Sequence, residues 1–402
     1  MSSRRCDNWL MELSRGVRVT ESPEHFWLWS GIFTIAAAVQ RKVWLPYGIS
    51  TIYPNLYVMI VAPPGVCRKS PPVKLAKQLL LDLGIPVYAD SPSKRALTKA
   101  LAKIKETNGF EFWSGDTKIY KAMSSYSLIS EELSSFLALD PKGMIEVLTD
   151  LFDSSDRWEY KTSDKGEDIL FNVCINCLFA STPIWIAANL PAESIGGGFT
   201  SRFLMVSGLE RARPVAIPEA IPERIYKNLI GDLSRISNLV GPFSWSDDGR
   251  DYFVEWYNRL PALTSDIRDW RLQPSIARMH IQVIKTAMAL RMAYSDELVL
   301  TADDIGQAKD LVDSVVRTAT DALDAYGRSP QALNTKQVMT QIRQLEQTTL
   351  GELMKMNYHD TTLPELKECL EALTAMGKIR QTYNPQTREQ DVFWLRKGDK
   401  NA

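Results

Sequence analysis

The stretch YPNLYVMIVAPPGVCRKSPPVKLAKQLL, residues 53–80, decides the fold class of this chain. Its first part, Leu56 to Val61, is a continuous aliphatic and aromatic run bounded by proline and glycine, which is typical of a central parallel strand buried on both faces. From Pro72 to Leu83 the apolar residues recur at helical spacing. Strand, turn and helix in this order predict the first step of an α/β domain.

Other segments extend this pattern in both directions. Pro23 to Arg41 is apolar nearly all round and predicts a buried helix, and Ser91 to Lys105 predicts a helix with basic residues on its outer side. Tyr126 to Ile129 and Ile169 to Ala188 are further buried runs. Strands that alternate with helices predict a parallel sheet covered on both faces.

The turn after the first strand has the composition of a phosphate-binding loop. Backbone N–H groups of the turn and of the helix N-terminus would bind phosphate, Lys69 would reach the β- and γ-phosphates, and Ser70 would hold magnesium. The segment therefore predicts ATP and Mg²⁺ as cofactors. The candidate residues are Pro64, Gly65, Val66, Cys67, Arg68, Lys69 and Ser70.

This loop departs from the usual phosphate-loop pattern G-x-x-x-x-G-K-[ST]. Pro63 and Arg68 stand where the two glycines are expected, and Pro71 and Pro72 remove two N–H groups from the start of the helix. The alternative interpretation is a strand-to-helix connection of another α/β enzyme, in which Lys69 is solvated.

The run from Tyr126 to Ile129 delivers Glu131 and Glu132 at its carboxyl end, where ligands of open α/β sheets bind. We predict that Glu131 holds the metal and that Glu132 orients the attacking water, because phosphoryl transfer depends on positioning and charge stabilisation. The alternative is a solvated helix N-terminus, where the helix dipole favours glutamate.

Two more catalytic candidates come from later segments. Thr182 follows a buried run, and we predict that its hydroxyl contacts the γ-phosphate or the attacking water; a simple strand-end turn is the alternative. In IGGGFTSRFLMV, residues 195–206, a glycine-rich loop is expected to present Arg202 at an edge, to act across a subunit boundary. A surface arginine beside a hairpin loop is the alternative there.

The segment YPNLYVMIVAPPGVCRKS, residues 53–70, resembles the P-loop ATPases of phages and mobile elements, which include primase-helicases. The resemblance extends over residues 25–330 and rests on the phosphate loop and the Glu131-Glu132 segment. It implies a RecA-like or AAA-like core joined to replication modules. It also implies a ring in which an arginine such as Arg202 serves the neighbouring subunit.

The chain is predicted to have four parts. Residues 1–48 form an N-terminal helical segment, residues 49–215 the P-loop NTPase core, residues 216–328 a helical domain and residues 329–402 a winged-helix domain. The proline-rich stretch 213–222 predicts the linker between core and helical domain.

The C-terminal part shows three helical patterns at 334–345, 348–357 and 362–376, followed by two strands with a turn at Asn384-Pro385. This order predicts a winged helix, whose third helix would place Lys367 in the major groove of DNA. Arg380 and Arg388 on the wing would contact phosphate. Three glutamates on the same helix would repel phosphate, so a protein-contact or subunit-packing role stays open; they are Glu365, Glu368 and Glu371.

Composition limits the partners and the compartment. The formal net charge is −1, so nucleic-acid binding would need local basic patches rather than a global field. Cys174 and Cys177 lie in an apolar run without a second ligand pair and are predicted to be buried thiols. The cysteines are scattered, the N-terminus lacks the pattern of a signal peptide, and the longest apolar stretch, Phe26 to Val39, is too short to span a bilayer. We therefore expect a cytoplasmic protein.

These features lead to two functional hypotheses. The first is an ATP-hydrolysing nucleic-acid motor, a ring-forming (hexameric) replicative DNA helicase of a phage or mobile element. Its partners would be single-stranded DNA, duplex DNA through the winged helix, further copies of the chain and a primase. The alternative is a DNA-binding initiator or adaptor whose degenerate phosphate loop hydrolyses ATP weakly or not at all.

Overall fold

The computed structural model describes residues 4–88, 91–162, 166–196, 198–323, 330–358, 361–386 and 389–395. The chain divides into two compact units, residues 1–323 and 324–402. The first unit includes the predicted N-terminal segment and NTPase core, and the predicted helical domain up to residue 323.

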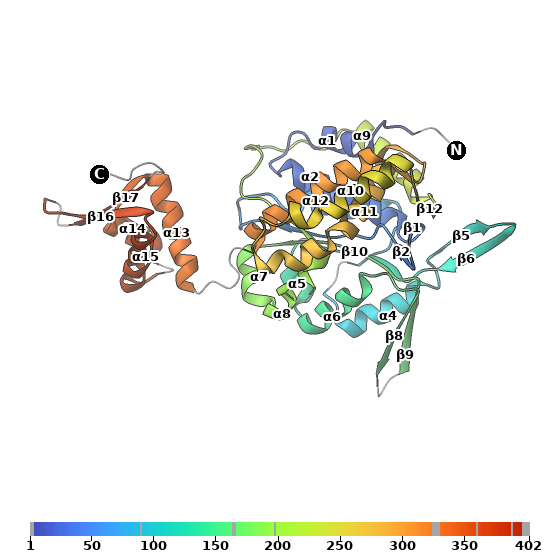
Figure 1. Ribbon diagram of the computed structural model, residues 1–402, viewed down its shortest axis with the longest axis horizontal. Coiled ribbons are helices and arrows are strands. Elements are labelled where there is room, and N and C mark those ends of the chain that lie inside the picture. Colours follow the sequence, from blue (N-terminus) through green and yellow to red (C-terminus); the bar gives the residue numbers. More distant parts are fainter. Residues whose placement is uncertain are drawn as a thin grey trace. The chain divides into compact units, whose positions relative to one another are not determined.

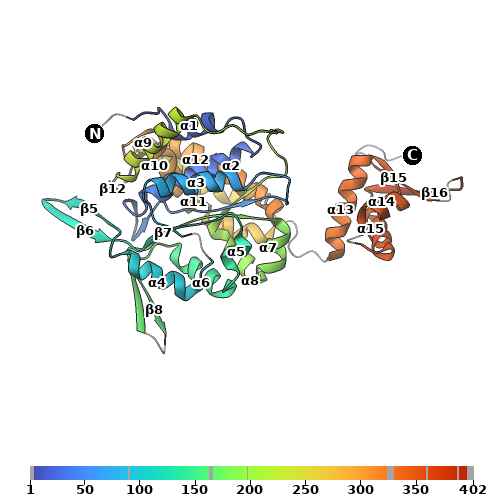
Figure 2. The same cartoon turned by 180° about the vertical axis from the view of Figure 1, so that it is seen from behind.

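The first unit is built on a parallel sheet (Figure 1 and Figure 2). Its strand order among the described residues is β11-β3-β10-β7-β4, and every neighbouring pair is parallel. The predicted α/β class with a parallel sheet is confirmed. The strands are β3 (Tyr57–Val61), β4 (Val87–Tyr88), β7 (Ser125–Ser130), β10 (Cys174–Ser181) and β11 (Phe203–Ser207).

Helices cover both faces of this sheet because its central strands are apolar on both sides. Val58 and Ile60 of β3 share a hydrophobic core with α2 and α3, whereas the Tyr57 hydroxyl donates to Leu148 O of α6 at 3.0 Å and Phe179 packs on Phe136 of α5. The predicted buried helix at 23–41 is confirmed as α2. The helices on the two faces include α2 (Glu24–Val39), α3 (Ser70–Asp82), α5 (Leu133–Leu137) and α6 (Pro141–Leu151).

The helical pattern predicted after residue 226 is also confirmed, but these helices share one hydrophobic core with the sheet. Val283 of α11 and Val312 of α12 belong to the same buried cluster as Val58. The helices are α9 (Glu223–Ser237), α10 (Asp247–Leu263), α11 (Gln273–Tyr294) and α12 (Ala302–Ala322). The remaining elements around them are α1 (Trp9–Gly16), β1 (Val43–Tyr47), β2 (Ser50–Ile52), β12 (Gly241–Pro242), β13 (Ser244–Trp245), η2 (Trp270–Leu272) and β14 (Val299–Leu300).

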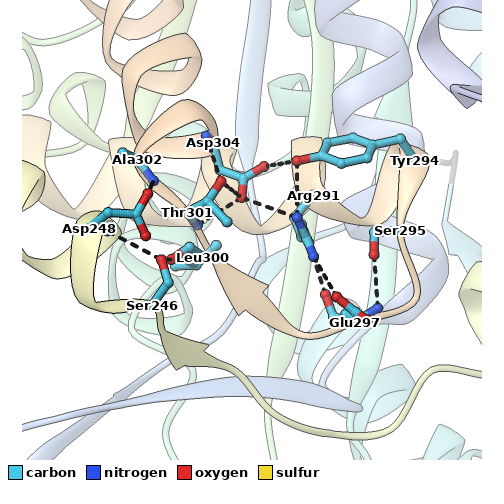
Figure 3. Close-up of polar contacts among 11 residues, drawn as sticks. Ser246, Asp248, Arg291, Tyr294, Ser295, Glu297, Leu300, Thr301, Ala302 and Asp304 are labelled. Carbon is cyan, nitrogen blue, oxygen red and sulfur yellow. Dashed lines mark hydrogen bonds and ion pairs between the residues drawn. The ribbon is translucent and has the colours of Figure 1, made fainter.

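A buried polar network fixes the start of α12 (Figure 3). Asp304, whose side chain is 1% exposed, accepts hydrogen bonds from Thr301 N at 2.9 Å and from the Tyr294 hydroxyl at 2.6 Å. The Arg291 guanidinium lies 3.9 Å from the same carboxylate. Asp304 thus closes a capping box and also neutralises a partly buried arginine on α11.

We expect Asp304→Ala to lower the free energy of unfolding by about 3 kcal/mol, because it removes the capping bonds of α12 and the buried acceptor of the Tyr294 hydroxyl, and leaves Arg291 paired with the exposed Glu297. Asp303→Ala, an exposed residue of the same helical turn, should change stability by less than about 1 kcal/mol. Urea unfolding followed by tryptophan fluorescence measures this in the first unit, because Trp394 is the only tryptophan beyond residue 323. Equal losses in the two variants would contradict the proposed role of the network.

Two β-hairpins that the sequence patterns did not indicate project from the first unit in both views (Figure 1 and Figure 2). The first, β5 (Gly109–Ser114) with β6 (Thr117–Ala122), precedes β7. The second, β8 (Arg157–Thr162) with β9 (Gly166–Phe171), precedes β10. Between β4 and the first hairpin lies α4 (Lys94–Ile104), which confirms the helix predicted at 91–105.

The second unit contains three helices and a three-stranded antiparallel sheet of order β15-β17-β16 in the part that the structure describes. The three predicted helices and the final strand pair are confirmed, and β15 is an addition. Val338, Leu353 and Leu366 meet in its core. The elements are α13 (Pro330–Leu345), β15 (Gln347–Thr349), α14 (Leu350–Asn357), α15 (Leu363–Ala375), β16 (Ile379–Asn384) and β17 (Glu389–Trp394).

No helix among the described residues combines the length and the apolar content needed to cross a lipid bilayer.

Cys174 and Cys177 on β10 are free thiols with no exposed surface, which confirms the prediction that they are buried. Burial raises the pKa of the Cys174 thiol to about 11.

Candidate nucleotide-binding site

The carboxyl ends of three neighbouring strands meet at one edge of the sheet. Val61, the last residue of β3, lies opposite Ser181, the last residue of β10, and Ala62 N donates to Ser181 O at 3.3 Å. On the other side of β10, Ser130 at the end of β7 lies opposite Phe179. The polar residues that follow these strands therefore gather at the edge where ligands of α/β sheets bind.

The phosphate-loop candidate occupies the connection from β3 to α3. Pro64, Gly65 and Val66 form an exposed turn, and Gly65 has φ +71°, with no atom within 4 Å of a Cβ built on it. This left-handed conformation favours glycine and leaves open space above the turn. Ser70 begins α3, so a phosphate placed here would face a helix N-terminus, although Pro71 and Pro72 withhold two N–H donors.

Lys69 immediately precedes α3 and is half-buried. Its ammonium donates to Ala62 O at 2.7 Å, back toward the end of β3. Burial lowers the pKa of Lys69, whereas the charges of Cys67 and Glu132 act to raise it. The lysine is thus held over the turn, with Glu132 among the charged groups that act on it.

Contacts distant in sequence hold the loop from its other side. Ser22 Oγ donates to Arg68 O at 2.6 Å, and the Arg68 side chain forms an ion pair with Glu21 at 2.6 Å. The Cys67 thiol donates to Glu210 O at 3.2 Å. The side chains of Arg68 and Cys67 therefore anchor the loop. At these two positions, only the backbone N–H groups would contact a phosphate.

Sequence reasoning missed Glu21 and Ser22. Neither residue carries a motif, and they lie more than 40 positions before their partners in the loop. Their part in shaping the loop is visible only in the folded chain.

Glu131 and Glu132 follow β7 as predicted, and both are exposed. Glu131 forms an ion pair with Lys74, one turn into α3, at 3.4 Å. Glu132 occupies the N-cap position of α5, but its carboxylate caps no N–H group of the described residues. The carboxylate of Glu132 is thus not used in capping α5, and its charge acts to raise the pKa of Lys69.

Thr182 follows β10 and begins α7 (Pro183–Asn189). Its hydroxyl oxygen accepts from Trp185 N at 3.2 Å, so it serves as a helix cap and retains its own O–H as a donor. The structure therefore brings Lys69, Glu132 and Thr182 to the same edge of the sheet.

The structure does not bring Arg202 to this edge. Arg202 lies in η1 (Thr200–Arg202), after α8 (Ala192–Gly196) and directly before β11, at the amino end of the strands. Its side chain is 10% exposed, donates to Gly198 O at 2.8 Å and lies 3.7 Å from Asp153. Arg202, which was expected to be presented at an edge, is thus largely buried, and the alternative of a surface arginine does not describe it either.

Two further cations are buried at the amino end of the strands. Lys285 of α11 donates to Asn55 O at 3.2 Å, and burial lowers its pKa to about 7. Arg41 donates to Val173 O at 2.8 Å and forms an ion pair with Asp156. These contacts fix the end of the sheet opposite to the phosphate loop.

The predicted nucleic-acid residues belong to the second unit. Lys367 on α15 lines a groove of about 660 Å³ whose walls include Leu350, Met354 and Tyr358. Arg380 on β16 lies over the Phe393 ring at 5.6 Å. Arg388 lies outside the described residues. The groove around Lys367 is mainly apolar, which fits the alternative of a protein contact better than a phosphate contact.

Within the described ranges no group of three or more His, Cys, Asp or Glu side chains is placed to hold a metal ion. Magnesium in phosphate sites is bound by one or two protein groups together with phosphate oxygens, and Ser70 with Glu131 or Glu132 fits that donor set. No protein-family model matches the chain, and comparison with curated proteins gave no significant match.

Proposed function

We propose that this protein is an ATP-hydrolysing motor that acts on nucleic acid, with a RecA-like or AAA-like P-loop core. The observation that carries the proposal is the convergence of Lys69, Glu132 and Thr182 at the carboxyl edge of a parallel sheet, beside an open glycine turn that leads into a helix. Cation, carboxylate and hydroxyl around a helix N-terminus are the groups that phosphoryl transfer requires.

Each residue has a role in this proposal. The turn at Gly65 and the start of α3 bind phosphate, and Lys69 leaves Ala62 O to pair with the terminal phosphates. Bound Mg²⁺ would neutralise the charge that develops on the transferred group, with Ser70 and Glu131 as its protein ligands. Glu132 orients the attacking water, and the Thr182 hydroxyl donates to the water or the γ-phosphate.

Ring formation and DNA belong to the same proposal. Arg202 lies at the edge opposite to its own phosphate loop, so the nucleotide it serves would be that of a neighbouring subunit. The guanidinium donates a hydrogen bond to Gly198 O and forms an ion pair with Asp153. Ring assembly would therefore have to break these contacts before Arg202 could reach a neighbouring nucleotide. Three helices and a small antiparallel sheet in the second unit support a winged-helix module for duplex DNA, and a primase is the proposed replication partner.

The proposal is tested by ATP hydrolysis of the full chain with Mg²⁺, with and without single-stranded DNA, while light scattering records oligomer size. We expect turnover that rises at least about ten-fold when DNA is added, together with an ATP-dependent oligomer. A chain that binds ATP but shows the same turnover with and without DNA would contradict a nucleic-acid motor.

A DNA-binding adaptor is the second candidate. It is favoured by Pro71 and Pro72 in the first turn of α3 and by the engagement of Arg68 with Glu21, since all three reduce the number of phosphate donors. The adaptor predicts DNA affinity that is the same with and without ATP.

A further inference from the structure

Helix α4 carries an exposed basic row. Arg95, Lys99 and Lys103 follow one another at intervals of four residues, so they lie along one face of the helix over about 12 Å. All three are exposed, and none forms an ion pair with an acidic residue in the described part of the chain. The opposite face of the helix buries Leu97 and Leu101.

The hairpin that follows α4 exposes two aromatic rings. Trp113 is 67% and Tyr120 57% exposed, and the register places them as diagonal neighbours on one face. The opposite face is packed, since Phe112 meets Trp44 with ring centroids 5.7 Å apart. The hairpin is thus anchored on one side and exposes Trp113 and Tyr120 on the other, where the Tyr120 ring lies over Gly109.

Hydrogen bonds tie this hairpin to the sheet and to the second hairpin. Asn172, directly after β9, donates through its side-chain amide to Ala122 O at 2.8 Å, and Ser124 N donates to Phe171 O at 2.8 Å. Cys174 N at the start of β10 donates to Ser124 O at 3.1 Å. The hairpins are therefore fixed to the amino ends of β7 and β10, and the carboxyl ends of these strands lead to Glu132 and Thr182.

We propose that the basic row of α4 and the aromatic face of the β5–β6 hairpin form the surface of the first unit that binds single-stranded nucleic acid. The phosphate backbone lies along Arg95, Lys99 and Lys103, and unpaired bases stack on Trp113 and Tyr120. A duplex does not offer base faces for stacking, which makes a single strand the ligand. This inference rests on the proposed motor function and adds the location of the surface that binds its nucleic acid.

The position of this surface also gives a route for coupling. Nucleic acid bound at the β5–β6 hairpin would act on the amino ends of β7 and β10, to which the hairpin is attached. The carboxyl ends of these two β-strands lead to the catalytic candidates. Binding at one end of two packed strands can therefore bias the arrangement of Glu132 and Thr182 at the other.

The test measures binding of a fluorescently labelled oligo-dT to the full-length protein by anisotropy, without nucleotide, over a range of salt concentrations. The triple variant Arg95→Gln, Lys99→Gln, Lys103→Gln should bind at least about ten-fold more weakly, and its slope of log affinity against log salt should fall by about 2. The matched control replaces Arg224, Lys227 and Arg259, exposed cations on α9 and α10, by glutamine, and it should keep the wild-type slope.

The aromatic face is tested separately by Trp113→Ala with Tyr120→Ala. Affinity for oligo-dT should fall about ten-fold or more while the salt slope stays at the wild-type value, because stacking releases no counterions. Both sets replace exposed side chains, so unchanged thermal unfolding should accompany the losses.

Three outcomes overturn the proposal. One is a wild-type salt slope in the α4 variant, and another is loss of binding only in a Lys367→Gln, Arg380→Gln variant of the second unit. The third is competition by polyglutamate as effective as competition by unlabelled oligo-dT, which would indicate an acidic protein as the ligand. Since no ATP is present, an inactive ATPase would not affect this test, and failure of the two proposals can be told apart.

Discussion

Replacing Lys69 by alanine should lower the rate of ATP hydrolysis at least about 100-fold, because the variant lacks the cation that stabilises the charge of the transferred phosphoryl group. Lys69 stands at the start of α3, half-buried above the end of β3. Its ammonium donates to Ala62 O, which is a backbone atom rather than a carboxylate. The ammonium can therefore transfer to a phosphate without breaking an ion pair.

The measurement is steady-state turnover with Mg²⁺-ATP and single-stranded DNA. Lys77→Ala on the same helix is the matched control and should keep at least half of the wild-type rate. Thermal unfolding of the Lys69 variant should stay close to wild type, since the lost hydrogen bond is worth about 1 kcal/mol. Wild-type turnover in the Lys69 variant would show that hydrolysis occurs at another site.

Glu132→Gln should lower hydrolysis about 100-fold to 1,000-fold while nucleotide binding is retained. The amide keeps the shape of the side chain but cannot accept a proton from water or orient it by charge. Because Glu132 makes no capping hydrogen bond among the described residues, the substitution should leave α5 intact. Single-turnover hydrolysis and binding of a fluorescent ATP analogue separate the two effects.

Glu131→Gln gives the comparison within the same dipeptide. Its carboxylate is paired with Lys74, so we expect the Glu131 variant mainly to need more Mg²⁺ for the same rate. If Glu131→Gln lost turnover at saturating Mg²⁺ and Glu132→Gln did not, the two proposed roles would have to be exchanged.

Local sequence was sufficient for the elements that build the site. The strand at Leu56 to Val61 and the helix after it could be predicted because a continuous apolar run and a helical spacing are set by neighbouring residues alone. The same holds for the strand before Glu131 and for the helical patterns from residue 226 onward. Each of these predictions depended on a short run of consecutive residues.

Other features were not predicted. The β5–β6 hairpin was missed although its local pattern indicates it, since two alternating runs flank the two-residue turn Gly115-Asp116. Likewise, Arg202 follows a glycine-rich loop, which suggested exposure, but packing against Asp153 and Gly198 buried it.

By itself, then, the sequence determined the β-α order of this protein, the buried central strands and the turn that carries Lys69. The tertiary structure decided which of the candidate residues share one edge of the sheet. Because β10 lies between β3 and β7, Thr182 and Glu132 are at the same edge as Lys69, and the same strand direction places Arg202 at the opposite edge. The physical reason is that strand order and burial depend on contacts between residues far apart in the chain, whereas local patterns record only the preferences of neighbours.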